Sequence, residues 1–140
     1  MTGHGRLGVA TLFAACLVAS SAHAQALQHG EVLGNWTLRM IPAEGGESRI
    51  TVKTATGRLE QPLTVTAQGR SGILCRVDGD AADCRIRRGE LVVTLRMDDA
   101  RMIYTLTSRR GGGFAGNTQM SLPMLPFGSV HLGAAELVPR

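Results

Sequence analysis

Residues 91–106 read LVVTLRMDDARMIYTL, and this stretch decides the fold. Apolar side chains occupy every second position on both sides of a short acidic step, at Leu91, Val93, Leu95, Met97, Met102, Tyr104 and Leu106. A period of two places neighbouring side chains on opposite faces of a strand, whereas a helix needs a period of 3.6. The stretch therefore predicts two strands, each with one buried face.

The same alternation continues through the chain in short segments separated by turns that contain Gly or Pro. The predicted strands lie around residues 36–40, 50–52, 63–66, 73–77, 84–86, 91–97, 102–106, 114–121 and 129–137. Eight or nine strands at this spacing are typical of antiparallel sandwiches and barrels. We therefore expect an all-β domain over residues 34–140, either a single antiparallel up-and-down β-barrel or a β-sandwich.

The first part of the chain has the pattern of a signal peptide. Leu7 to Val18 is apolar and uncharged, follows Arg6, and precedes the small-residue cleavage pattern Ala22-His23-Ala24. We expect residues 1–24 to be removed before Gln25, which would make the protein periplasmic or secreted. The apolar run is shorter than the roughly 20 residues that span a bilayer, so no transmembrane span is expected.

The chain has three cysteines. One of them suggests an alternative to signal-peptide cleavage before Gln25, and the other two suggest a disulfide. Cys16, preceded by Phe13-Ala14-Ala15, resembles a lipoprotein processing site and leaves a lipid anchor open. Two cysteines then remain, Cys75 and Cys84, and an even number in an exported chain predicts a disulfide. They are symmetric about Gly79-Asp80, a recognised two-residue hairpin turn.

That turn would define the register of the hairpin. It sets Cys75 opposite Cys84 as a non-hydrogen-bonded pair with Cα atoms about 4.5 Å apart, within the range that a disulfide tolerates. It also sets Arg76 opposite Asp83 on the outer face, which is an attractive cross-strand pair.

Several functional classes are disfavoured by the sequence. The formal net charge of +4 is mild and dispersed, and together with export this argues against nucleic-acid binding. Gly111, Gly113 and Gly116 fit G-x-G-x-x-G but precede a predicted strand instead of the helix that a dinucleotide site needs. The acidic cluster of residues 78–83 lacks the spacing of an EF-hand. We therefore expect no metal and no cofactor.

The sequence also contains no complete catalytic constellation. After the expected cleavage only His29 and His131 remain as histidines, no G-x-S-x-G motif occurs, and both remaining cysteines are assigned to the disulfide. The expectation is a protein that is not an enzyme. Met40, Met97 and Met102 fall on inward rows and are predicted to fill the core, not to bind copper.

A basic group is expected on the outside of the domain. Arg76, Arg85, Arg87 and Arg96 fall on the outer faces of neighbouring predicted strands. Such a group is either a solvated face, partly neutralised by Asp83 and Glu90, or a contact surface for an anionic lipid or an acidic partner.

Gly34-Asn35-Trp36, at the start of the first predicted strand, resembles the G-x-W signature of calycins. Calycins are up-and-down barrels that include lipocalins, avidins and a family of bacterial metalloprotease inhibitors. The resemblance implies that Trp36 closes one end of a barrel and that Arg140, after the last strand, packs over it.

Two functional hypotheses follow. The leading one is an exported, non-enzymatic binding protein of the bacterial envelope that binds a small apolar ligand or an envelope component, with Trp36, Met40, Met102 and Tyr104 as candidate lumen residues. The alternative is a periplasmic metalloprotease inhibitor, because that branch of calycins has an N-terminal trunk before G-x-W. The resemblance then implies that residues 25–33 form an N-terminal arm whose Gln25, Ala26, Leu27 and Gln28 contact a secreted protease.

Overall fold

The computed structural model describes residues 27–43, 59–123 and 128–140. The described elements are one short 3₁₀ helix and eight strands: η1 (His29–Glu31), β1 (Gly34–Pro42), β2 (Glu60–Gln68), β3 (Gly72–Val77), β4 (Asp80–Arg87), β5 (Glu90–Arg96), β6 (Arg101–Arg110), β7 (Gly113–Ser121) and β8 (Ser129–Pro139). The predicted strand at residues 50–52 lies outside the described residues.

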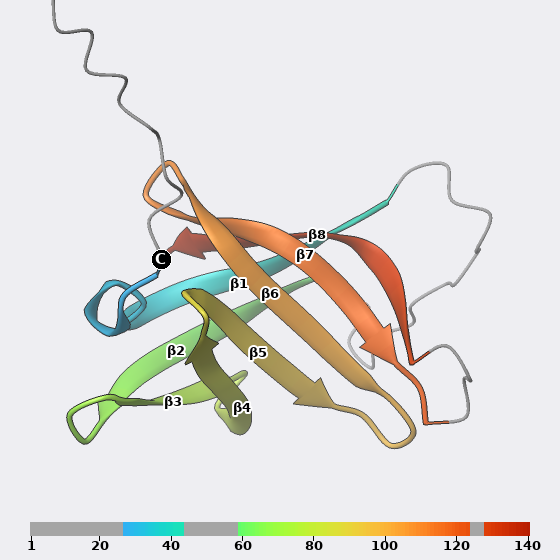
Figure 1. Ribbon diagram of the computed structural model, residues 1–140, viewed down its shortest axis with the longest axis horizontal. Helices are drawn as coiled ribbons and strands as arrows, with labels where there is room; N and C mark the ends of the chain where they lie inside the picture. Colours follow the sequence, from blue (N-terminus) through green and yellow to red (C-terminus); the bar gives the residue numbers. More distant parts are fainter. Residues whose placement is uncertain (1–26, 44–58, 124–127) are drawn as a thin grey trace, which may run out of the picture.

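The eight strands form one closed antiparallel barrel in sequence order (Figure 1). Each strand pairs with the next, and β8 returns to pair with β1. This confirms the all-β prediction and selects the up-and-down barrel over the sandwich. Within the described ranges, no helix has the length and apolar character needed to cross a membrane.

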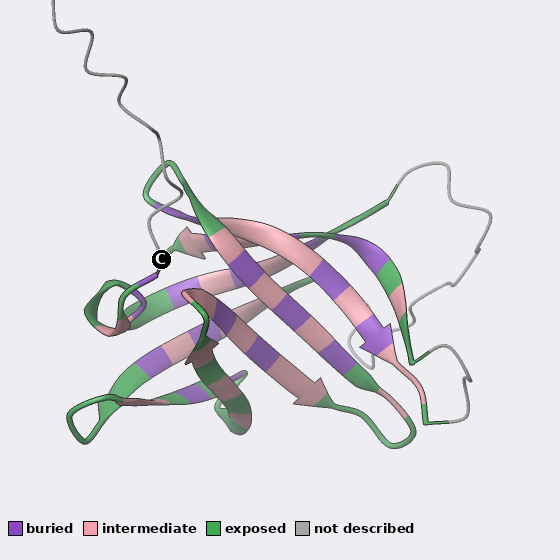
Figure 2. Cartoon of the chain, in the orientation of Figure 1, coloured by how far each residue is buried: buried purple, intermediate pink, exposed green. Residues whose placement is uncertain are grey.

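Alternating burial along the strands explains why the sequence adopts this fold (Figure 2). In β6, Met102, Tyr104 and Leu106 are buried, and the residues between them are only partly buried. Burying these rows removes apolar surface from water and supplies the main favourable term in folding. The inward prediction is confirmed for Met40 and Met102.

The inward prediction is wrong for Met97. β5 ends at Arg96, and the amide of Met97 donates to the carbonyl of Ala100 at 2.8 Å in the turn before β6. The chain has therefore left the strand pattern one residue earlier than the alternation suggested, and the Met97 side chain is 37% exposed.

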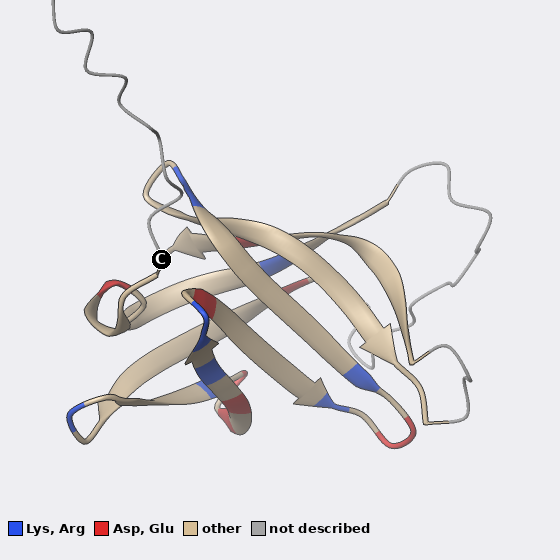
Figure 3. Ribbon diagram, viewed as in Figure 1, with Lys and Arg blue, Asp and Glu red and all other residues tan. Residues whose placement is uncertain are grey.

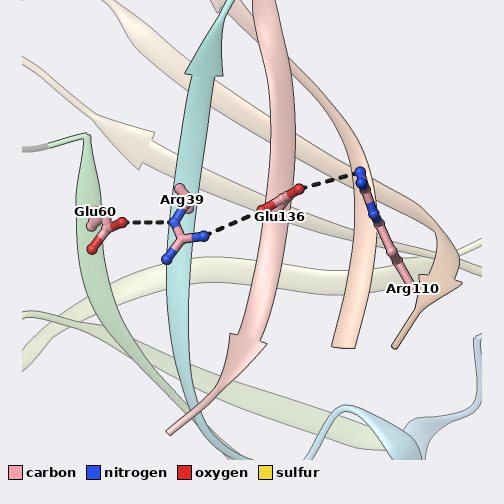
Figure 4. Close-up of polar contacts among 4 residues, drawn as sticks. All are labelled: Arg39, Glu60, Arg110 and Glu136. Carbon is pink, nitrogen blue, oxygen red and sulfur yellow. Dashed lines mark hydrogen bonds and ion pairs between the residues drawn. The ribbon is translucent and has the colours of Figure 1, made fainter. Parts of the chain in front are cut away.

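The barrel closes where β1 meets β8, a junction that we call the seam. Seven residue pairs join the two strands, from Trp36 opposite Pro139 to Pro42 opposite Gly133. On its outer surface, Arg39 contacts Glu60 of β2 at 2.7 Å and Glu136 of β8 at 3.5 Å. Glu136 also contacts Arg110 of β6 at 3.3 Å, so four charged side chains run across the seam (Figure 4).

The β3–β4 hairpin differs from the expected register. Its turn is Asp78-Gly79, with φ angles of 52° and 85°, and not Gly79-Asp80. A type I′ turn needs positive φ at both central residues, and Asp-Gly meets this requirement. Val77 therefore lies opposite Asp80, and Cys75 lies opposite Ala82, so the predicted register, with Cys75 directly opposite Cys84, is wrong.

The predicted outer-face pair changes with the register. Arg76 lies opposite Ala81, and its guanidinium donates to the carbonyl of Gly79. Asp83 lies opposite Thr94 of β5 and contacts Arg96 at 3.1 Å. Asp83 therefore pairs with β5, not with β3.

The disulfide itself is confirmed. Cys75 and Cys84 are bonded, with their Cα atoms 6.0 Å apart. This separation falls within the usual range for disulfides, and it joins residues that are diagonal neighbours across the hairpin.

Candidate binding site

The β3–β4 ladder is the shortest in the barrel, and it ends early. Its three pairs stop at Cys75 opposite Ala82. Beyond that point residues 72–74 of β3 continue to pair with β2, and residues 83–87 of β4 continue to pair with β5. We call the diverging parts of the two strands, residues 72–74 and 83–87, the fork. Figure 1 shows β3 and β4 leaving their shared hairpin in different directions.

The narrow end of the fork is held by covalent chemistry. Cys75 belongs to the last pair of the ladder, and Cys84 is the second residue of β4 beyond it. The disulfide therefore lies where the strands separate. The covalent bond keeps the two strands from separating further at this point, although the backbone ladder has already ended.

The wide end of the fork is crossed by the N-terminal arm. The amide of Leu27 donates to the carbonyl of Gly89, in the β4–β5 turn, at 2.8 Å. The His29 Nε2 contacts the carbonyl of Gly72, the first residue of β3. The arm thus links the far ends of the two diverging strands.

The arm is anchored by apolar packing as well as by these backbone contacts. Leu27 is 4% exposed and Val32 is fully buried, and both belong to the main core. The indole N–H of Trp36 donates to the carbonyl of Val32 at 2.9 Å, and the Trp36 ring lies 5.5 Å from that of Phe114. Trp36 therefore connects the arm to the barrel interior.

An ion pair adds to the docking of the arm. Glu31 of η1 contacts the guanidinium of Arg109 near the end of β6. The hydrogen bond from Arg109, with a second from the backbone amide of Gln28, lowers the pKa of Glu31 below its ordinary value of 4.5. The ionised carboxylate is the form that these donors stabilise.

The four candidate lumen residues all point into the barrel, where they are parts of one core. Trp36, Met40, Met102 and Tyr104 are each buried and belong to the same cluster of packed apolar side chains. The hydroxyl of Tyr104 donates to the Sδ of Met102 at 2.8 Å. Burial raises the pKa of Tyr104 to about 12, because the charged phenolate is poorly solvated there.

The candidate protease-contact residues do not form one exposed segment. Gln25 and Ala26 lie outside the described residues, Leu27 is buried, and Gln28 is exposed. Arg140 lies beside Thr37 and Pro62 in a hollow on the outside of the barrel. Trp36 is buried and belongs to the interior cluster, and the expected packing of Arg140 over Trp36 stays a prediction.

The outer surface carries several hollows, and those below are lined by described residues. They lie beside the β5–β6 turn, over β1 and β2, on the outer face of β4–β6, and at the β6–β7 turn, with volumes of about 460, 490, 420 and 280 Å³. None of these four is lined by a candidate lumen residue. These four hollows therefore lie on the outside of the wall.

Basic residues occupy part of β4 at the fork, where the ribbon of β4 carries blue segments (Figure 3). Arg85 and Arg87 are exposed on the outer face of β4, and Arg76 is exposed on β3. Asp83 is engaged by Arg96, whereas Arg85 and Arg87 have no partner among the described residues. The outer face of the fork is therefore net positive.

Sequence reasoning missed the fork and the docking of the arm. The fork depends on the register of one hairpin, and the Asp78-Gly79 dipeptide was the local signal that would have placed the turn one residue earlier. The apolar residues of the docked arm, such as Leu27, Val32 and Leu33, follow no repeating pattern that would have predicted its docking.

Among the described residues, no group of three or more His, Cys, Asp or Glu side chains gathers in a way that could hold a metal ion. Comparison of the chain with known protein families, with curated proteins and with solved structures gave no match.

Proposed function

We propose that this protein is an exported, non-enzymatic binding protein of the bacterial envelope, and that it binds an envelope component at the fork. The observation that carries the proposal is the early end of the β3–β4 ladder, which leaves two diverging strand edges in an otherwise continuous wall. Strand edges are ready-made surfaces for pairing with another chain.

The packed interior favours this surface over the lumen. A small apolar ligand would have to displace side chains such as Met102, which is 1% exposed. Carriers of small molecules instead keep a largely pre-formed pocket. We therefore propose binding of an envelope component and not carriage of an apolar ligand.

The docked arm also makes protease inhibition the weaker candidate. Insertion of the arm into a protease cleft would pull Leu27 out of the core and break its backbone bond to Gly89. Losing the burial of one leucine costs about 1.5–3 kcal/mol before any contact with the protease is made.

Site-specific photo-crosslinking in intact cells tests the proposed surface. A photoreactive residue replaces Leu74, which belongs to the fork and is 51% exposed, or Ile41, which is 43% exposed on the seam strand β1 and serves as a matched control. We expect an adduct from position 74 and none from position 41. Equal adducts at both positions, or none at position 74, would contradict the proposal.

The single tyrosine provides a test of the packed interior. Absorbance titration of the folded protein should show ionisation of Tyr104 at a pKa of about 12. A water-filled lumen would instead give a value near the ordinary 10. In parallel, saturable binding of a fatty acid such as palmitate that Met102→Trp abolishes would restore the lumen hypothesis.

A further inference from the structure

One edge of β4 has no strand partner at the fork among the described residues. The two-residue turn makes Val77 and Asp80 a hydrogen-bonded pair, and alternation makes Cys75 and Ala82 the next one. The amides and carbonyls of Cys84 and Ile86 therefore face the same side as those of Ala82. Among the described strands, none pairs with them on that side, because β3 has diverged.

The other edge of β4 is occupied. The Arg88-Gly89 turn, with φ angles of 53° and 75°, makes Arg87 and Glu90 a hydrogen-bonded pair. Alternation then pairs Arg85 with Val92 in the same way. The backbone N–H and C=O groups of Arg85 and Arg87 are therefore hydrogen-bonded to β5, and those of Cys84 and Ile86 point toward the fork.

The side chains around this edge have two different chemical characters. Ile73, Cys84 and Ile86 point inward and are partly buried against the core. Arg85 and Arg87 point outward and are exposed. A strand laid along β4 would alternate in the same way, so its inward residues would meet an apolar row and its outward residues would meet guanidinium groups.

The edge is already in place for such a partner. The disulfide holds the narrow end of the fork, and the contacts of Leu27 and His29 hold the wide end. A pre-ordered edge loses little conformational entropy when a partner strand pairs with it.

We propose that the fork binds an extended acidic peptide segment of a partner protein, which adds as a strand to the free edge of β4 at Cys84 and Ile86. The inference rests on the proposed function and names its partner class. Carboxylates at alternate positions of the segment contact Arg85 and Arg87, and small apolar residues between them contact Ile73 and Ile86.

Fluorescence anisotropy with a labelled synthetic peptide of about six residues, a usual strand length, tests the inference on the full chain. The peptide alternates Glu with Val. We expect saturable binding that weakens as the salt concentration rises from about 0.05 to about 0.5 M, because exposed charges are screened over a Debye length. A peptide in which Lys replaces Glu should bind at least roughly tenfold more weakly, a difference of about 1.4 kcal/mol.

Two substitutions at one position separate backbone pairing from side-chain contact. Ile86→Pro removes an N–H that β5 does not use, so the barrel should keep its ladder while the peptide loses a bond. Ile86→Ala removes the side chain and keeps the N–H. We expect Ile86→Pro to weaken binding roughly tenfold and Ile86→Ala to weaken it only about two- to threefold.

N-methylated peptides repeat this test on the unchanged protein, so the result does not depend on the folding of Ile86→Pro. Alternate amides of a strand point to opposite edges, so only one of the two alternating sets faces β4. Methylation of that set should weaken binding roughly tenfold, and methylation of the other set should leave the affinity within about twofold. Equal effects of the two sets would overturn strand addition.

Charge reversal tests the acidic character of the partner. The double variant Arg85→Glu with Arg87→Glu should bind the Lys peptide more tightly than the Glu peptide, which reverses the order of affinities expected for the wild type. Arg140→Glu, which follows β8 and lies beside Thr37 and Pro62 in a separate hollow, is the matched control and should leave the preference unchanged.

Three results would overturn the inference. The first is binding of neither peptide; a crosslink at position 74 would then keep the proposed function while removing this partner class. The second is binding of both peptides with equal affinity. The third is tight binding to phosphatidylglycerol vesicles that Ile86→Pro leaves unchanged, which would assign the basic face to a membrane surface.

Discussion

The seam and the fork are both junctions in the barrel wall, and they are held in different ways. At the seam, β1 and β8 come from opposite ends of the domain, pair over seven residues and carry four linked charges on the outside. At the fork, β3 and β4 are neighbours in sequence, pair over three residues and are joined by a disulfide.

The seam is the junction that stabilises the barrel, and the fork is the junction that we propose for binding. A long ladder over a buried core satisfies the backbone groups of the seam and leaves no edge for a partner. The short ladder of the fork leaves edges available, and the covalent bond supplies there the restraint that pairing does not. The same wall can therefore be closed at one junction and offer a binding edge at the other.

Truncation of a core side chain should show the largest contrast between the junctions. Leu38→Ala in β1, where Leu38 is 1% exposed, should lower the free energy of unfolding by about 2–5 kcal/mol. Ile86→Ala in β4 should cost less than half as much, because that side chain is only partly buried. Urea denaturation followed by circular dichroism measures both, and equal losses would remove the energetic distinction.

Removal of the disulfide should give the next largest effect. Cys75→Ser with Cys84→Ser opens a short loop and should lower the free energy of unfolding by about 2–3 kcal/mol without changing the fold. Amide exchange should increase in β3 and β4 and stay unchanged at the seam. A uniform increase over all strands would show that the fork is not a separate region.

The charges over the seam should contribute less. Glu136→Gln removes a carboxylate that contacts both Arg39 and Arg110 and is 17% exposed, and it should cost about 1 kcal/mol at low salt. The control Asp83→Asn breaks the pair with Arg96, in which both side chains are more than half exposed, and should be close to neutral. Similar decreases in the free energy of unfolding for the two variants would argue against a special role for the seam network.

The arm should show the smallest effect, and it should depend on pH. The pKa of Glu31 is lowered in the folded protein, so its contribution is present above the ordinary value of 4.5 and is lost as the pH falls through the folded value. Wild type should therefore be more stable than Glu31→Gln near pH 7, and the two should converge once the pH has fallen below the lowered pKa of Glu31. A difference that persists at low pH would mean that the Arg109 contact does not act through the charge of Glu31.

The alternation of apolar residues was enough to predict the barrel wall. It placed eight strands and assigned Met40, Met102 and Tyr104 to the interior, because a closed sheet with one wet face imposes a period of two on every strand. It failed at Met97, where the turn begins before the pattern ends. Strand termini depend on turn hydrogen bonds that hydropathy does not encode.

The site was only partly predictable. The sequence paired Cys75 with Cys84 correctly, but it chose the wrong turn, and that choice hid the fork. The seam network could not be foreseen, since Arg39 and Glu136 meet only after the barrel has closed. Local rules set the hairpins, whereas contacts between distant strands follow from the finished topology.

Residue-resolved amide hydrogen exchange along β4 in the free protein tests the distinction between seam and fork most directly. We predict slow exchange for the amides of Arg85 and Arg87, which pair with β5, and fast exchange for those of Cys84 and Ile86, which face the fork. In the seam strand β1, neighbouring amides from Thr37 to Met40 should all be protected, because both of its edges are paired there. Uniform protection along β4 would show that its edge is already covered, and would contradict both the open fork and the binding site built on it.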